Sequence, residues 1–183
     1  MIVESDEAPS FPWYGETGAN DLEQGDFLSS LPVFETPYPT ALQAGAQVRA
    51  TAKIYDVIVL SQSCDLLAGK IENVLVAPHF SLSDAREAIP TLKDVNRCED
   101  TRRGYLHSFH LLNACEIQGY ESEVRVVSFR QVFTVPLNYA LAQTTGNKER
   151  LRLLPPYREH LAQAFARFVM RVGLPQDIPP FKK

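Results

Sequence analysis

A polar segment at positions 61–65 (SQSCD) carries the residues best suited to covalent chemistry in this chain. Cys64 is a candidate nucleophile, because a nearby base can convert a thiol into the reactive thiolate. His79 is the candidate base, and Asp65 can orient its imidazole as in a catalytic triad. These residues predict a cysteine-dependent hydrolase or transferase. The alternative is structural, because cysteine is often buried and Asp65 can cap a turn.

Zinc binding is a second chemistry to consider, since thiolates and imidazoles are the usual zinc ligands. The residues concerned are Cys98, His107, His110 and Cys115. In a strand, residues three apart point to opposite faces, so His107 and His110 would share one ion only on a loop or helix. We therefore expect structural or surface histidines and predict no metal and no other cofactor. The sequence leaves open whether the four residues meet.

Arginines of the C-terminal half form the third candidate set. A guanidinium can bind a phosphate through two hydrogen bonds, and a tyrosine can stack on a base. The predicted nucleic-acid-binding residues are Arg125, Arg130, Arg158, Arg167 and Arg171. Their expected ligand is RNA or single-stranded DNA. The alternative is a solvated helix face with ion pairs to the acidic half of the chain.

Charge is distributed unevenly between the two halves. Residues 1–100 contain 16 acidic and 6 basic residues, a net charge of −10, whereas residues 101–183 contain 6 and 12, a net charge of +6. We expect residues 1–24 to form a flexible acidic arm that screens the basic surface, anchored through Phe11, Trp13 and Tyr14. Alternatively, the two halves pair with each other in the fold.

The composition is that of an ordinary globular domain, with 45% hydrophobic and 22% charged residues among 183. Three cysteines at irregular spacing favour free thiols in a reducing compartment. No apolar run approaches the roughly 20 residues of a membrane-spanning helix, and the first residues do not resemble a signal peptide. We therefore expect a cytoplasmic protein without a membrane partner.

The elements that would position these residues are mostly strands. Apolar runs at 55–60 and 74–77 predict strands buried on both faces, and 124–136 predicts a central strand. The prolines within 31–46 predict a loop with extended character. Residues 96–104 are polar and predict another loop.

Two helices are also predicted. Ser83 can cap a short helix that Pro90 interrupts. An apolar stripe with a 3.6-residue period predicts an amphipathic helix over residues 156–173. The expected fold is mainly β, of the α+β class. About five strands with peripheral short helices give a small β-barrel or an α+β domain, and residues 25–183 form one domain that ends in the amphipathic helix.

Three short motifs resemble the MazF/PemK toxin superfamily over roughly residues 25–82. They are Gly25-Asp26-Phe27, residues 56–61 (DVIVLS) and residues 73–78 (NVLVAP). The resemblance implies an SH3-like barrel with a long insertion after its first strand. It also implies a toxin–antitoxin or phage-defence setting and an ancestral role as a sequence-specific endoribonuclease.

Two positions depart from the pattern of that family. Tyr55-Asp56 stands where the family usually has Arg-Pro, and the polar residue expected after Ala-Pro is displaced to Ser81. Loss of the guanidinium removes the group best suited to stabilising a phosphorane. We therefore expect a nucleic-acid- or protein-binding module, with a protein partner or a homodimer as its assembly, and without assured ribonuclease activity.

Overall fold

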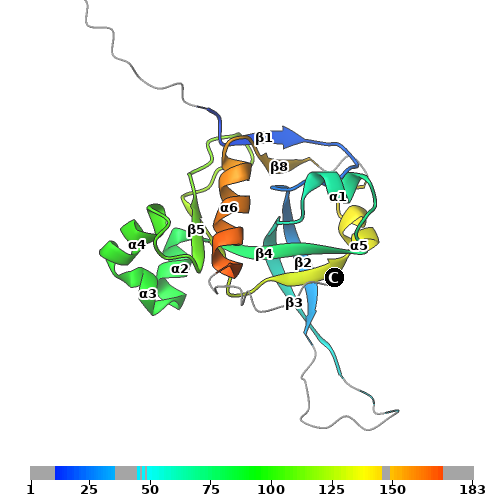
Figure 1. Ribbon diagram of the computed structural model, residues 1–183, viewed down its shortest axis with the longest axis horizontal. Helices are drawn as coiled ribbons and strands as arrows, with labels where there is room; N and C mark the ends of the chain where they lie inside the picture. The colour runs from blue at the N-terminus through cyan, green and yellow to red at the C-terminus, as the bar shows by residue number, and fades with distance from the viewer. Residues whose placement is uncertain (1–10, 36–44, 46, 48, 146–148, 171–183) are drawn as a thin grey trace, which may run out of the picture.

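The structure is a computed structural model that describes residues 11–35, 45, 47, 49–145 and 149–170 (Figure 1). Its main sheet is antiparallel with the strand order β2-β3-β4-β6-β5, and β7 pairs with the first part of β4. The strands are β2 (Phe27–Glu35), β3 (Thr51–Val59), β4 (Asn73–Ser81), β5 (Phe109–Leu112), β6 (Arg125–Ser128) and β7 (Phe133–Pro136).

The two apolar runs form the paired strands β3 and β4, which confirms the prediction of buried strands. Val59 lies opposite Val76, and Ile58 lies opposite Ala77. Val59 and Val76 pack into one hydrophobic cluster, whereas Ile58 and Ala77 pack into another. Because successive side chains of a strand point to opposite faces, a strand between two cores needs an unbroken apolar run.

Residues 124–136 do not form one central strand as predicted. The chain turns after β6, where Phe129 packs against Phe165 and Phe168 with ring centroids 5.4 and 5.9 Å apart. β6 and β7 then pair with successive parts of β4, so β4 is the central strand. The run of strand-forming residues does not predict this turn, because the turn goes with the packing of Phe129 against a helix far away in the sequence.

The loop of extended character predicted for 31–46 begins as a strand instead, because β2 continues through Pro32 to Glu35; residues 36–44 and 46 lie outside the described residues. β2 is an edge strand of the sheet path, and an edge strand tolerates a proline whose missing N–H would face solvent.

From residue 11 onwards, the segment expected to be a flexible arm is instead part of the fold. A second sheet joins β1 (Tyr14–Thr17) to β8 (Arg150–Leu153). The ring of Trp13 stacks on Tyr157 with centroids 3.6 Å apart. Tyr14 is buried, and its hydroxyl donates a hydrogen bond to the Asn113 carbonyl over 2.5 Å. Burial of these aromatic side chains fixes the segment. Residues 1–10 lie outside the described residues.

Six described helices complete the fold. They are α1 (Ser63–Leu67), α2 (Leu82–Ala88), α3 (Pro90–Lys93), α4 (Val95–Arg102), α5 (Leu137–Ala142) and α6 (Tyr157–Val169). Ser81 rather than Ser83 caps α2, accepting a hydrogen bond from the Asp84 N–H over 3.0 Å. α4 occupies most of the stretch predicted as a polar loop. In Figure 1, α2, α3 and α4 gather beside β5, and α6 stands along the sheet.

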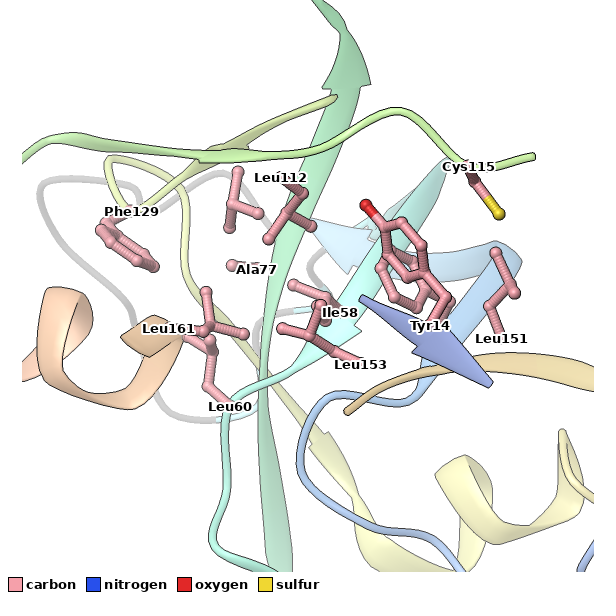
Figure 2. Close-up of a cluster of buried hydrophobic side chains, with 12 residues drawn as sticks. Tyr14, Ile58, Leu60, Ala77, Leu112, Cys115, Phe129, Leu151, Leu153 and Leu161 are labelled. Atoms are coloured by element: carbon pink, nitrogen blue, oxygen red, sulfur yellow. The ribbon is translucent and has the colours of Figure 1, made fainter. Parts of the chain in front are cut away.

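The main core lies between the two sheets and α6. Figure 2 shows Phe129 and Leu161 at one end of this cluster and Tyr14, Cys115 and Leu151 at the other. Leu161 is the fully buried residue of the amphipathic helix, so the predicted apolar stripe does close the core. The predicted end of that helix, residues 171–173, lies outside the described residues.

The fold is therefore mixed α+β, and its main sheet is open. No sheet closes on itself within the described part of the chain, so the SH3-like barrel is not confirmed. Among the described residues, no helix is long and apolar enough to cross a membrane.

Candidate functional site

The predicted cysteine site is not assembled as a triad. Cys64 is exposed on α1, where its thiol lies 3.8 Å from the Asp65 carboxylate. His79 lies on β4 beyond Pro78, which pairs with Val57, whereas α1 follows the other end of β3. His79 and Cys64 therefore occupy opposite ends of the β3–β4 pairing. Ser81, the fourth predicted catalytic residue, caps α2 instead.

His79 instead contributes to what we call the polar groove, defined by Asp56, His79 and Arg125. These three side chains are shared by two cavities of about 360 and 450 Å³. Asp56 is exposed on β3, and its carboxylate accepts a hydrogen bond from the Ser30 N–H over 2.8 Å. Ser30 has a φ of 53° at the irregular register of β2, a left-handed conformation that aims this N–H at Asp56.

Arg125 is held in the polar groove by His79. Its Nη1 lies 2.8 Å from His79 Nδ1. Because a guanidinium only donates, Nδ1 must accept, which leaves the imidazole neutral with its proton on Nε2. Burial, together with the charge of Arg125, lowers the pKa of His79 to about 3. His79 is therefore a fixed acceptor that orients Arg125, and it is too buried to serve as a base for Cys64.

The polar groove is acidic apart from Arg125. Its lining carboxylates are Asp56, Asp84, Glu121 and Glu149. The other lining cation, Arg150, is already bound to Asp26 over 2.8 Å. One anionic group can bind at Arg125, but the surrounding carboxylates oppose a polyanion.

A second site, which we call the basic cleft, is lined by the end of α4, the α4–β5 connection, β5 and α6. It is a cavity of about 180 Å³. Its charged and titratable lining residues are Arg102, Arg103, His107, His110, His160 and Arg167. No carboxylate is among the described residues that line it. With three arginines, this cavity has more lining cations than the polar groove or the other cavities described here.

Glu99 organises one wall of the basic cleft from outside. Its carboxylate accepts hydrogen bonds from Arg102 over 2.7 Å and from Arg103 over 2.6 Å. These bonds lower the pKa of Glu99 to about 2. With Arg167 on the opposite wall, three guanidinium charges and one carboxylate charge leave a net charge of +2 around the cleft.

His110 supplies a buried polar atom to the same cleft. Its Nε2 is buried without a hydrogen-bond partner among the described residues. Burial, together with the nearby charges of His160 and Arg167, lowers the pKa of His110 to about 4. The imidazole is therefore neutral, and its Nε2 can bond to a ligand.

The four residues considered for zinc do not converge. His107 and His110 both line the basic cleft, because His107 lies in the connection before β5 rather than in the strand. Cys98 is a buried residue of α4 and donates to the Leu92 carbonyl over 3.0 Å, whereas Cys115 is buried in the main core. Among the described residues, no three His, Cys, Asp or Glu side chains, the cleft histidines included, are placed so that they could hold one metal ion.

The predicted arginine face is dispersed. Arg125 lies in the polar groove and Arg167 in the basic cleft. Arg130 lies 5.4 Å from the ring centroid of Phe109, which also lines the cleft. Arg158 is paired with Glu159 over 2.9 Å and with Glu23 over 3.5 Å. Arg171 lies outside the described residues.

Sequence reasoning missed Arg102, Arg103 and His160 as cleft residues. The adjacent Arg102-Arg103 pair was a visible signal, but it fell in the stretch predicted as a loop.

Acidic residues near the start of the chain do pair with arginines near its end. Asp26 is fully buried and binds Arg150 and Arg152, and Glu23 binds Arg152 and Arg158. This network joins Asp26 to the adjacent strand β8. Within the described residues, acidic side chains of the first half thus form ion pairs with arginines of the second half. This is the alternative that the sequence left open beside a screening arm.

Comparisons with known proteins return no match to a protein-family model and none to a curated protein.

Proposed function

We propose that this protein binds single-stranded nucleic acid, RNA in the first place, through the basic cleft. The observation that carries the proposal is the concentration of Arg102, Arg103 and Arg167 around a cavity that no described carboxylate lines. Phosphate groups supply most of the affinity in nucleic-acid binding, and arginine is the side chain best shaped to hold them.

An exposed aromatic side chain near the cleft supports a single-stranded ligand. Tyr105 directly follows Gly104, a lining residue, and 70% of its surface is exposed. Stacking of a base on an aromatic ring requires an unpaired nucleotide, and it tolerates any sequence. The proposal therefore predicts modest sequence preference.

The resemblance to the MazF/PemK superfamily supports RNA as the ligand, and an SH3-like barrel and a toxin–antitoxin or phage-defence setting remain proposals from that resemblance. Ribonuclease activity receives less support. Arg125 supplies a fixed guanidinium near Asp56, but the carboxylates around the polar groove oppose a phosphodiester there.

The test is fluorescence anisotropy with a labelled RNA of about 12 nucleotides, within the range of known single-strand sites. Binding is measured from about 50 to about 200 mM salt. We expect Arg167→Ala to weaken binding and to reduce the slope of log affinity against log salt by about 0.7, the value for one lost phosphate contact on a single strand.

Arg97→Ala is the matched control. Arg97 is exposed on α4 and pairs with Asp100 over 3.3 Å, but it does not line the cleft. Equal losses in both variants would indicate unspecific attraction to the charged surface and would contradict the proposed site. If no RNA or single-stranded DNA binds, a protein partner becomes the better interpretation.

A further inference from the structure

We propose that the basic cleft recognises a terminal phosphate monoester at the end of a nucleic-acid strand, rather than an internal phosphodiester. This inference rests on the proposed function, because it names the part of the nucleic acid that enters the same cleft. Three observations support it: the charge of the cleft, its unpartnered imidazole nitrogen and the shape of the adjoining surface.

The charge of the cleft matches a monoester better than a diester. A terminal phosphate carries a charge of about −1.5 to −2 at neutral pH and presents three strong acceptor oxygens. An internal diester carries a single charge and presents fewer free oxygens. The net charge of +2 around the cleft comes from Arg102, Arg103 and Arg167 less Glu99. Glu99 already binds Arg102 and Arg103, but its single charge leaves the three guanidinium groups in excess, and this excess favours the more highly charged ligand.

The buried nitrogen of His110 is a specific partner for one additional oxygen. A buried polar atom without a hydrogen bond costs free energy, which a ligand can recover by pairing with it. His110 Nε2 is such an atom, and His110 lines the cleft. In the tautomer that carries its proton on Nε2, the neutral imidazole can donate to a phosphate oxygen that the arginines have already brought in.

The adjoining surface fits the first nucleoside. A second, more open cavity of about 580 Å³ shares His107, Gln163 and Arg167 with the basic cleft and is otherwise lined by Ala166 and Met170. Met170 is 77% exposed. A polarisable thioether packs well against an aromatic base. A phosphate in the small cationic cavity would thus place its attached nucleoside against an apolar surface.

The experiment compares RNAs of one sequence that differ only at their ends. One pair carries a 3′ label with either a 5′-phosphate or a 5′-hydroxyl, and the other carries a 5′ label with either a 3′-phosphate or a 3′-hydroxyl. We expect one phosphorylated end to bind about tenfold more tightly than its hydroxyl counterpart, the size of one charge-assisted hydrogen bond. Inorganic phosphate should compete for the phosphorylated RNA.

Two variants assign the effect to the cleft. Arg167→Ala and Gln163→Glu, both at exposed positions of α6, should abolish the preference for the phosphorylated end, whereas Arg97→Ala should keep it. Far-UV circular dichroism and thermal unfolding check that each variant folds. The second variant provides an independent test because it adds a carboxylate without removing an arginine.

The possible failures can be told apart. Equal affinity for phosphate and hydroxyl ends, with Arg167→Ala still weakening all RNAs, would overturn the terminal-phosphate inference and leave nucleic-acid binding in place. An end preference that survives both cleft variants would place the recognition elsewhere and overturn the inference too. Absence of binding to every RNA would overturn the proposed function and this inference together.

Discussion

Lowering the pH from 7.5 to about 5 should destabilise this protein through two histidines, the buried His79 and the mostly buried His110. Burial lowers the pKa of His79 to about 3 and that of His110 to about 4. In the unfolded chain both imidazoles titrate near 6.5. Between about pH 6.5 and the folded pKa, the unfolded chain therefore binds protons that the native state does not. Since the unfolded state binds more protons, stability rises with pH across this window and falls on acidification.

The loss of unfolding free energy at about pH 5 is set by the pKa of the unfolded imidazoles, because both folded pKa values lie at or below about 4. The unfolded imidazole gains about 1.5 pH units of proton binding, which corresponds to about 2 kcal/mol per histidine. Two such groups give a loss of about 4 kcal/mol. This is a large part of a typical stability of roughly 5–15 kcal/mol.

The assay is urea unfolding at neutral pH and at about pH 5. We expect His79→Gln and His110→Gln each to reduce the pH-dependent loss by about 2 kcal/mol, whatever their effect at neutral pH. The window avoids carboxylates such as Glu99, whose pKa is lowered to about 2. Val127→Ala is the matched control because Val127 pairs with both histidines across the sheet, does not titrate, and should lower stability at both pH values equally.

Two results would refute this reasoning. One is a wild-type loss below about 1 kcal/mol, which would mean that the imidazoles are protonated in the native state at little cost. The other is a full wild-type loss in both glutamine variants, which would assign the pH dependence to other groups.

Two further predictions concern the core network and the thiols. Asp26→Asn should destabilise the protein by about 3–5 kcal/mol in urea unfolding, because it leaves the arginines of the buried network without their carboxylate. The control Asp100→Asn, at an exposed ion pair, should cost less than about 1 kcal/mol. Similar costs for the two variants would show that the buried network is dispensable. Iodoacetamide should label Cys64 in the folded protein and label Cys98 and Cys115 only after unfolding, because Cys64 alone is exposed. Labelling of Cys64 at the rate of free cysteine would leave the thiol without an activating base, and much faster labelling would revive the cysteine-dependent mechanism.

Local patterns determined several elements of this protein. The runs at 55–60 and 74–77 are apolar without interruption because β3 and β4 lie between two hydrophobic clusters. Every position of these strand segments therefore favours an apolar residue. The stripe of α6 likewise follows from a helix that buries one face, with Leu161 at its centre. In these cases the apolar or polar type of each residue predicts whether it is buried, so the hydrophobic pattern is sufficient to predict the element.

The sites depended on contacts that no local pattern encodes. His79 and Arg125 are 46 residues apart and meet only because β4 pairs with β6. His110 and Arg167 share the basic cleft because β5 and α6 lie on either side of it. The sequence indicated histidines and arginines as candidates, but it could not say which of them would meet.

The two largest errors have the same origin. A composition rich in acid, proline and glycine predicted a flexible arm anchored by aromatic side chains. Trp13 does stack on Tyr157, but the composition did not predict that β1 pairs with β8 from near the end of the described chain. Cys64 and His79 were joined because their strands pair, yet the antiparallel register carries them to opposite ends. Residue types are local properties of the chain, whereas strand register and long-range aromatic packing are set by the free energy of the whole fold, and they alone decided which side chains became neighbours.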